Sequence, residues 1–232
     1  MSEFIRDNIK LILGDCMDIM KTYPDNYFDL AVVDPPYGIN FSQYQRTNID
    51  KLGNRYKAEH YKAKDWDDSI PDELYFNELK RVSKNQIIWG GNYFFDILGN
   101  SKGLICWFKH QPVNNFADCE YAWTNIDRPA KVFDYKYFGN LEGSTKANQK
   151  YHPTQKPIEL YNWIFKNYAK KEMKILDTHG GSFNPPKSAY MFECKEFVGI
   201  EKDKDYFDKA IVSFNKFVYL NPKHKNDNIF EF

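Results

Sequence analysis

The feature that most constrains this chain is an uninterrupted apolar run that leads directly into two prolines. The run is Asp29-Leu30-Ala31-Val32-Val33, and Asp34-Pro35-Pro36-Tyr37 follows it. Apolar residues without alternation are typical of a strand that is covered on both faces, as in a parallel sheet. The prolines fix two φ angles, remove two backbone donors and hold the residues before them extended. The stretch therefore predicts a stiff corner at the carboxyl end of a buried strand, where open α/β sheets bind ligands.

The corner carries groups that suit a planar ligand with an amino group. Asp34 offers an acceptor, the Pro35 carbonyl cannot turn away into a helix, and Tyr37 offers a flat face. The alternative interpretation is a proline-rich turn with a solvated aspartate. The rest of the chain has to decide between the two.

Composition sets the broad class of the protein. The 232 residues are enough for one sizeable α/β domain with its own core. The formal net charge is zero, so a contact with nucleic acid must come from a local basic patch. The four cysteines are scattered and form no CxxC pair, which argues against a zinc site and for a reducing cytosol. No signal peptide and no membrane span are expected.

Apolar runs and helical spacing predict further elements. Strands are expected at 10–13, 86–89, 103–108, 119–124, 173–177 and 196–201, and helices at 16–21, 71–83, 93–98, 158–168 and 206–219. Asp15 is placed to cap the first of these helices. The helix at 71–83 is expected to bury Leu74, Tyr75, Leu79 and Val82 on one face.

A second group of strand-end residues lies toward the C-terminus. Asp177 ends a predicted strand, and the turn Thr178-His179-Gly180-Gly181-Ser182 follows it. Glycines after a strand let the backbone approach a ligand closely. About twenty residues beyond the glycines, the next strand ends in Glu201, a position that suits a ribose diol. Asn184 is expected to cap the intervening helix, with Pro185 at its first position.

Two segments combine basic and aromatic side chains. The long polar stretch at 39–65 suits contact with phosphates and unstacked bases, although a solvated loop is the alternative. Its basic residues are Arg46, Lys51, Arg55, Lys57, Lys62 and Lys64. The second segment, 125–150, is expected to hold a small β excursion or loop, and it includes Arg128 and Lys131.

The corner at Asp34-Pro35-Pro36-Tyr37 resembles motif IV of the DNA amino-methyltransferases, which transfer methyl from S-adenosylmethionine to an exocyclic amine of adenine or cytosine. The string His152-Pro153-Thr154-Gln155-Lys156-Pro157 resembles their motif X, and the glycine turn after Asp177 resembles motif I. Motif IV comes first, as in the permuted β-type members, and the resemblance covers essentially the whole chain. It implies a single domain, 1–232, with an α/β fold: a doubly wound, mostly parallel, Rossmann-like sheet.

The resemblance also implies residue roles. The target base is flipped out of double-stranded DNA and methylated by direct displacement. Its amine is held at a catalytic corner that comprises Asp34, Pro35, Pro36 and Tyr37. The S-adenosylmethionine site comprises Asp15 at the adenine, Glu201 at the ribose, the motif X residues at the methionine end, and the motif I turn. The complete cofactor set is Asp15, Asp34, Thr154, Lys156, Pro157, Asp177, His179, Gly180, Gly181, Ser182 and Glu201.

Some questions stay open at this point. Thr178 and His179 replace the usual Pro-Phe of motif I, and Phe183 replaces a small residue, which bears on cofactor affinity. Asp34 favours adenine N6 over cytosine N4 as the target, with cytosine N4 and a DNA-binding relative of impaired catalysis as alternatives. The resemblance implies a bacterial or phage-encoded cytoplasmic protein of restriction-modification type, with 125–150 as a short target-recognition insertion. The recognised sequence and the oligomeric state, a homodimer included, are open.

Overall fold

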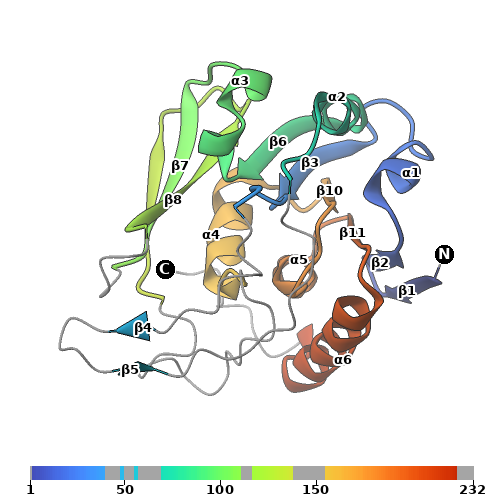
Figure 1. The fold of residues 1–232 in the computed structure, drawn as a ribbon. Coiled ribbons are helices and arrows are strands. Elements are labelled where there is room, and N and C mark those ends of the chain that lie inside the picture. The colour runs from blue at the N-terminus through green and yellow to red at the C-terminus, as the bar shows by residue number, and fades with distance from the viewer. Residues whose placement is uncertain are drawn as a thin grey trace.

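The computed structural model describes residues 2–39, 48–49, 55–56, 69–110, 117–137 and 155–223. One nine-stranded sheet organises these residues, with helices on both of its faces (Figure 1). A separate two-stranded ribbon pairs β4 (Asn48–Ile49) with β5 (Arg55–Tyr56). Among the described residues, no helix combines the length and the apolar character needed to cross a membrane.

Five neighbouring strands form the parallel centre of the sheet. In spatial order they are β2 (Ile9–Leu13), β11 (Glu196–Glu201), β10 (Lys174–Asp177), β3 (Phe28–Val33) and β6 (Ser83–Trp89). The parallel pairing of β2 with β11 places the strand at 9–13 beside the C-terminal strands. The chain therefore has a mixed α/β fold with a large, mostly parallel sheet.

Antiparallel strands extend the sheet on both sides of this centre. β1 (Ser2–Arg6) pairs with β2 at one edge. Beyond β6 follow β8 (Cys119–Thr124), β7 (Gly103–Phe108) and β9 (Lys131–Asp134), and β8 runs antiparallel to both of its neighbours. β1 was not predicted, because every residue in it stays partly exposed and the strand carries no buried apolar signal.

The helices divide into two groups, one on each face of the sheet (Figure 1). One core packs strand residues against α1 (Cys16–Met20), α2 (Glu73–Val82) and α3 (Phe95–Leu98), with a 3₁₀ turn at Gly91–Tyr93 before α3. The other core packs them against α4 (Ile158–Tyr168), α5 (Asn184–Phe192) and α6 (Lys204–Leu220). This arrangement is the doubly wound architecture that was predicted.

Strand β3 leads into the corner at Asp34 and is buried on both of its faces. Its residues alternate between the two cores: Leu30 and Val32 pack in the core of α4 to α6, and Ala31 and Val33 in the core of α1 to α3. All four are almost completely buried. The prediction of a strand covered on both faces is confirmed, and the chain enters Asp34 from a fixed support.

Helix starts differ from the predictions where a different residue forms the cap. Helix α2 begins after Asp72, whose carboxylate accepts a hydrogen bond from Tyr75 N at 3.0 Å. Phe76 is buried in this helix while Leu74 is 66% exposed, so the predicted burial of Leu74 was wrong. At about 3.6 residues per turn, the spacing between Leu74 and Leu79 places them on nearly opposite sides of the helix. Helix α6 likewise begins earlier than predicted, because the carboxylate of Asp203 caps it.

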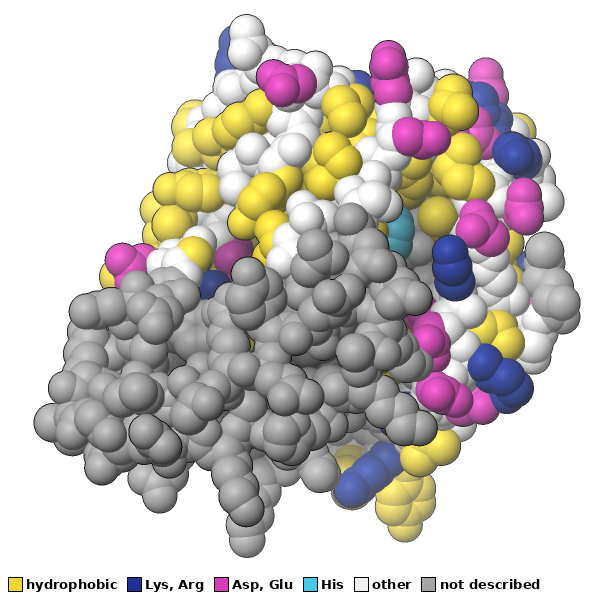
Figure 2. Space-filling model, viewed as in Figure 1, with side chains coloured by type: hydrophobic (Ala, Val, Ile, Leu, Met, Phe, Trp, Pro, Cys, Tyr) yellow, Lys and Arg dark blue, Asp and Glu magenta, His cyan; other side chains and the backbone are white. Residues whose placement is uncertain are grey.

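Among the described side chains on the face viewed in Figure 2, no large area carries a single charge. Acidic and basic side chains are interspersed over the α1, α2 and α6 side, and hydrophobic side chains gather over the β7–β8 side. The exposed aromatic residues that belong to β7, β8, α3 and the 3₁₀ turn before α3 are Tyr93, Phe95, Phe108 and Tyr121.

Candidate active site

The carboxyl ends of the parallel strands gather the predicted acidic residues along one edge of the sheet. Asp34 follows β3, Asp177 ends β10, Glu201 ends β11, and Asp15 comes two residues after β2. The Gly14 amide donates to the Glu201 carbonyl at 2.9 Å, which joins the ends of β2 and β11. Four residues from distant parts of the sequence thus share the edge at which open sheets bind ligands.

Asp34 is held by two donors on one oxygen. The Tyr37 hydroxyl donates to Asp34 Oδ1 at 2.5 Å, and the Lys156 ammonium donates to the same oxygen at 2.6 Å. The ammonium also lies 3.1 Å from the Tyr37 oxygen. The side chain of Lys156 is only 3% exposed. The sequence predicted both Asp34 and Lys156 as site residues, and the structure brings them into direct contact.

A second carboxylate, Glu120 on β8, also pairs with Lys156. Lys156 Nζ lies 3.2 Å from Glu120 Oε2, and Lys109 Nζ lies 2.9 Å from Glu120 Oε1. Neither Glu120 nor Lys109 was predicted as a site residue. In the sequence, Glu120 stands out as a charged residue within the predicted strand Cys119–Thr124. Only the pairing of β7 with β8 shows that Lys109 lies beside it.

Burial and charge act in opposite directions on the pKa values of these groups. Burial raises the pKa of Asp34 above its ordinary value, while Lys156 and Tyr37 oppose the rise. Burial also raises the pKa of Glu120, but Lys156 and Lys109 outweigh it and lower that pKa to about 2. Burial alone would lower the pKa of Lys156, yet Asp34 and Glu120 hold it above its ordinary value. Lys156 therefore stays a cation between two carboxylates.

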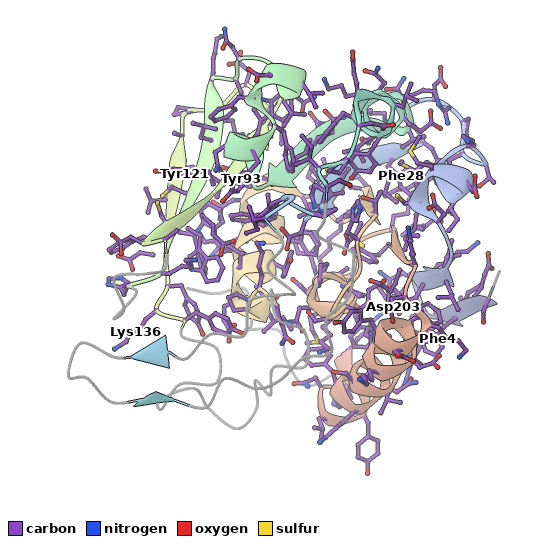
Figure 3. All side chains as sticks on the ribbon, in the orientation of Figure 1. Phe4, Phe28, Tyr93, Tyr121, Lys136 and Asp203 are labelled. Carbon is purple, nitrogen blue, oxygen red and sulfur yellow. The ribbon has the colours of Figure 1, made fainter. Side chains whose placement is uncertain are left out.

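The ring of Tyr37 is fixed by its neighbours after β6. Tyr93 stacks on it with ring centroids 5.0 Å apart and planes 17° apart. Gly90 lies so close that an added Cβ would sit 2.2 Å from Tyr37 Cε1, and its φ of +70° also favours glycine. Tyr93 is 45% exposed, and Figure 3 shows it between the β6 end and the β8 strand that carries Tyr121. Tyr93 and Gly90 therefore both pack against the Tyr37 ring.

Glu201 presents its carboxylate inside the glycine turn. Its two oxygens accept hydrogen bonds from Gly181 N at 2.6 Å and Asp203 N at 2.7 Å. Burial raises the pKa of Glu201, and these backbone donors oppose the rise. Each carboxylate oxygen can accept more than one hydrogen bond, so acceptor capacity remains for hydroxyl groups. Asp15 uses its Oδ1 to cap α1, where it accepts a hydrogen bond from Met17 N at 2.8 Å.

The Thr178-His179 part of the turn forms a buried hydrogen-bonded group. Thr178 Oγ1 lies 2.7 Å from the Tyr75 hydroxyl and 2.9 Å from His179 Nδ1. Burial lowers the pKa of His179 to about 4, so the ring is neutral at pH 7. Burial raises the pKa of Asp177 to about 8, although its Oδ1 accepts from His179 N at 3.1 Å.

The unusual residues after the glycines pack into the fold. Phe183 is completely buried in the core of α4 to α6, and an added Cβ on Gly180 or on Gly199 would meet its ring. Phe183, at φ +49°, caps α5, and Asn184 is the first helical residue, so the prediction of Asn184 as the cap was wrong. The Asn184 side chain instead donates to the backbone carbonyl of Lys156 at 2.8 Å, a role that requires tertiary contact.

The remaining predicted residues divide into three groups. Gly180, Gly181 and Ser182 lie in the turn, and Pro157 caps α4 rather than starting it. Arg128 and Lys131 lie away from the corner: β8 runs antiparallel to β6, so the turn after it leads toward the amino ends of the parallel strands. There the Arg128 guanidinium donates to the Asn167 carbonyl at 2.5 Å. Outside the described residues, or described without side chains, are Arg46, Lys51, Arg55, Lys57, Lys62, Lys64 and Thr154.

The chain thus places strand-end acids, a glycine turn and a proline corner on one edge of an α/β sheet. No family model matches the chain. Curated relatives are similar over most of it. The chain is 24% identical over 216 residues to the putative methylase YubD of Escherichia coli K12, and the alignment covers 85% of this chain and 86% of that protein. It is 23% identical over 266 residues to the type II methyltransferase M2.MboI of Moraxella bovis, with 95% and 91% covered.

Solved structures show the same fold. The M1.HpyAVI–SAM complex aligns with a TM-score of 0.55 at 18% identity, covering 89% of this chain and 100% of the other. The PvuII DNA methyltransferase, described as cytosine-N4-specific, aligns with a TM-score of 0.57 at 13% identity, covering 92% and 94%. The fold of this chain is therefore the one found in solved DNA methyltransferases.

Proposed function

We propose that this chain transfers a methyl group from S-adenosylmethionine to the exocyclic N6 amine of adenine in double-stranded DNA. One observation carries the proposal: the Asp34 corner, which suits an amine, shares a sheet edge with the glycine turn and Glu201, which suit a nucleoside. The names of the relatives, type II methyltransferases among them, support the same reaction.

The residues at this edge fit the cofactor. S-Adenosylmethionine carries an ammonium, a sulfonium and a ribose diol, and the edge carries the acids Asp15, Asp34, Asp177 and Glu201. Asp177 is buried, and its pKa is raised to about 8 in part by the neighbouring Asp34 and Glu201 charges. A cationic ligand lowers that electrostatic cost. Glu201 would hold the ribose hydroxyls, Asp15 the adenine, and the motif X segment at Lys156 and Pro157 the methionine end.

The base-binding half acts through orientation. When bound, the cofactor supplies an electrophilic methyl group. Asp34 and the Pro35 carbonyl accept the two amine hydrogens of the flipped base and so aim the nitrogen lone pair out of the plane of those contacts. The Tyr37 ring stacks on the base, and its hydroxyl fixes Asp34 at 2.5 Å. Placing the amine in this way supplies much of the rate. Asp34 need not be a strong base, because the methylated amine is cationic and releases its proton readily.

Adenine is the proposed target because residue 34 is Asp, and cytosine N4 is the alternative that the PvuII likeness keeps in view. A DNA-binding relative without catalysis is less favoured. That alternative was considered because the turn from Thr178 to Pro186 departs from motif I. The departing residue Phe183 packs into the core beneath the glycines, so its ring does not occupy the sheet edge where the acidic residues lie.

The proposal extends to the organisation of the chain. It is a single methyltransferase domain, 1–232, with the permuted β-type motif order, in a cytoplasmic protein of restriction-modification type. The basic segment 39–65 is the principal DNA contact. Arg128 is a weaker candidate for DNA contact because its guanidinium already binds the end of α4 and lies 5.6 Å from the Tyr168 ring centroid. Residues 125–150 would supply the short target-recognition element. Analytical ultracentrifugation of the purified protein would report whether it forms a homodimer.

The test is direct. Purified protein is incubated with isotopically labelled S-adenosylmethionine and genomic DNA that lacks modified bases, and the hydrolysed DNA is analysed by mass spectrometry. N6-methyladenine is the expected product, and N4-methylcytosine would select the alternative. Saturable cofactor binding by calorimetry without transfer to any DNA would favour the catalytically impaired relative. Modified-base sequencing of the same DNA identifies the recognised site.

A further inference from the structure

The oxygen that would receive the target amine is already occupied by another nitrogen. Lys156 Nζ lies 2.6 Å from Asp34 Oδ1, where it donates a hydrogen bond as an amine would. The Tyr37 hydroxyl donates to the same oxygen at 2.5 Å. An incoming amine must therefore compete with a buried cation for Asp34.

The cation has a second carboxylate within reach. Glu120 Oε2 lies 3.2 Å from Lys156 Nζ, and Lys109 holds the other Glu120 oxygen at 2.9 Å. The ammonium also lies 5.6 Å from the Tyr37 ring centroid and 5.4 Å from that of Trp89. A small rotation of the side chain can strengthen the contact with Glu120 without exposing the charge to solvent.

A hydrogen bond from α5 holds the backbone of Lys156 in place. Its carbonyl accepts a hydrogen bond from Asn184 Nδ2 at 2.8 Å, and Lys187 Nζ holds Asn184 Oδ1 at 3.0 Å. Pro157, the cap of α4, follows directly. These contacts localise the motion to the four-carbon side chain between two fixed carboxylates.

We propose that Lys156 is a positioning residue that covers Asp34 until the target base arrives, and that Glu120 then receives the displaced ammonium. This inference rests on the proposed function. The base amine takes the place of Lys156 Nζ on Asp34 Oδ1, while Lys156 keeps its charge and its proton and moves onto Glu120. Neither carboxylate is left without a partner at any stage, which matters because an uncompensated buried charge is strongly unfavourable.

The ionisation of Asp34 gives a readout that a purely structural role would not move. The groups that face it come from every element around the corner: Lys156, Tyr37, Glu120 on β8, Asp177 on β10, Tyr75 on α2 and Tyr161 on α4. Of these, Lys156 and Glu120 act on Asp34 with opposite signs. Removing the lysine charge should move the acid limb of activity to higher pH, and removing the glutamate charge should move it to lower pH.

The experiment compares Glu120→Gln, Lys156→Met and the double variant with the wild-type chain. Glu120→Gln leaves Asp34 as the one carboxylate in contact with the ammonium among the described residues, so kcat/KM for DNA should fall at least tenfold while S-adenosylmethionine affinity stays within twofold. In the Lys156→Met background the same Glu120→Gln change should add less than twofold, because Glu120 acts through the lysine. Glu196→Gln, at the opposite end of β11, is the control and should keep full activity.

Independent, multiplicative effects of the two changes, or a Glu120→Gln variant within twofold of wild type, would overturn the proposal. A second arm needs no turnover: ¹³C NMR titration of aspartate-labelled protein follows the Asp34 carboxyl directly. Opposite shifts of its pKa in Lys156→Met and Glu120→Gln support the proposal, and an unchanged pKa in Lys156→Met overturns it. Absence of methyl transfer by the wild-type chain would contradict the proposed function, and the NMR arm would still decide the Lys156 contact. If Lys156→Met fails to fold, Glu120→Gln carries both arms.

Discussion

The ring of Phe183 fills the space that a side chain on Gly180 would need. A Cβ added to Gly180 would lie 2.0 Å from Phe183 Cε1, well inside van der Waals contact. The two residues are three apart in the turn after β10, and the Phe183 amide donates to the Gly180 carbonyl at 2.7 Å. The aromatic residue that departs from motif I is therefore a support beneath the glycine, and the two positions are matched to each other.

This match predicts a strong coupling between two substitutions. Gly180→Ala should destabilise the chain by about 1–3 kcal/mol through overpacking. Phe183→Ala should cost about 3–5 kcal/mol through the lost buried ring. The double variant should cost clearly less than the sum, because the new methyl group enters the cavity that the ring left. Urea unfolding of the three variants measures this, and additive costs would show that the two side chains do not compete for the space.

Asp34→Ala should reduce methyl transfer at least a hundredfold, because the amine loses the acceptor that orients it. Removing one well-placed electrostatic contact typically costs about 10²–10³ in rate. Cofactor affinity should stay within threefold, since Glu201 and the glycine turn are untouched. The measurement is single-turnover transfer together with calorimetric binding. Asp29→Ala, at the other end of β3, is the matched control, and equal losses of rate in both variants would contradict the role of Asp34.

Glu201→Ala should weaken S-adenosylmethionine binding by about 1–3 kcal/mol, the usual cost of leaving buried polar groups unpaired. Glu201→Gln keeps one acceptor and should fall between the alanine variant and wild type. Glu196→Ala is the matched control at the opposite end of β11, where the carboxylate accepts only from Tyr27 in the described part of the chain. Calorimetry decides the matter, and wild-type affinity in Glu201→Ala would rule out the ribose contact.

Asp177→Asn should change how stability depends on pH. Burial raises the pKa of Asp177 to about 8 in the folded chain, while an unfolded aspartate ionises near 3.9. The folded state thus holds a proton that the unfolded state has lost, so wild-type stability falls as pH rises between these values. Asparagine cannot ionise, so its stability does not fall in this way. The Tm of Asp177→Asn minus the Tm of the wild-type chain should therefore be smallest near pH 4 and increase up to pH 8. Each kcal/mol is worth about 2–4 °C in a chain of this size.

Thermal unfolding across that pH range tests the Asp177 prediction. Asp208→Asn changes an exposed carboxylate on α6 and should leave the shape of the curve unaltered. Parallel Tm curves for Asp177→Asn and wild type would mean that Asp177 is ionised in the folded chain throughout.

Replacing Arg46, Arg55 and Lys57 together by Ala should weaken binding to all DNA sequences. With a formal net charge of zero, the chain depends on local basic segments for phosphate contacts. Losing two or three contacts should reduce the slope of log affinity against log salt by roughly 2–3. Preference among sequences should change little, because phosphate contacts position rather than specify. Arg128→Ala is the comparison, and a flattened slope in that variant alone would move the DNA contact to the β8–β9 turn.

Local features could be predicted from the sequence because their causes are local. The apolar run of β3 and the prolines after it define the corner without help from the rest of the chain. The helix from Ile158 to Tyr168 and the strand from Glu196 to Glu201 have the predicted bounds, since periodicity and the flanking residues mark their ends. The buried face of a helix was less certain: Leu74 is exposed because the 3.6-residue turn places it nearly opposite Leu79, which packs in the core.

The contacts of the site were decided by the tertiary structure. Lys156 is 122 residues from Asp34 in the sequence, and the two meet because β3 and the start of α4 reach the same sheet edge. Glu120 and Lys109 join them only through the pairing of β7 and β8, and a lone acid in a strand pattern does not reveal its partner. The sequence alone determined the chemical groups and the strand ends that carry them. Their pairing needed the folded chain, because electrostatic and packing contacts depend on distance in space, which local patterns do not encode.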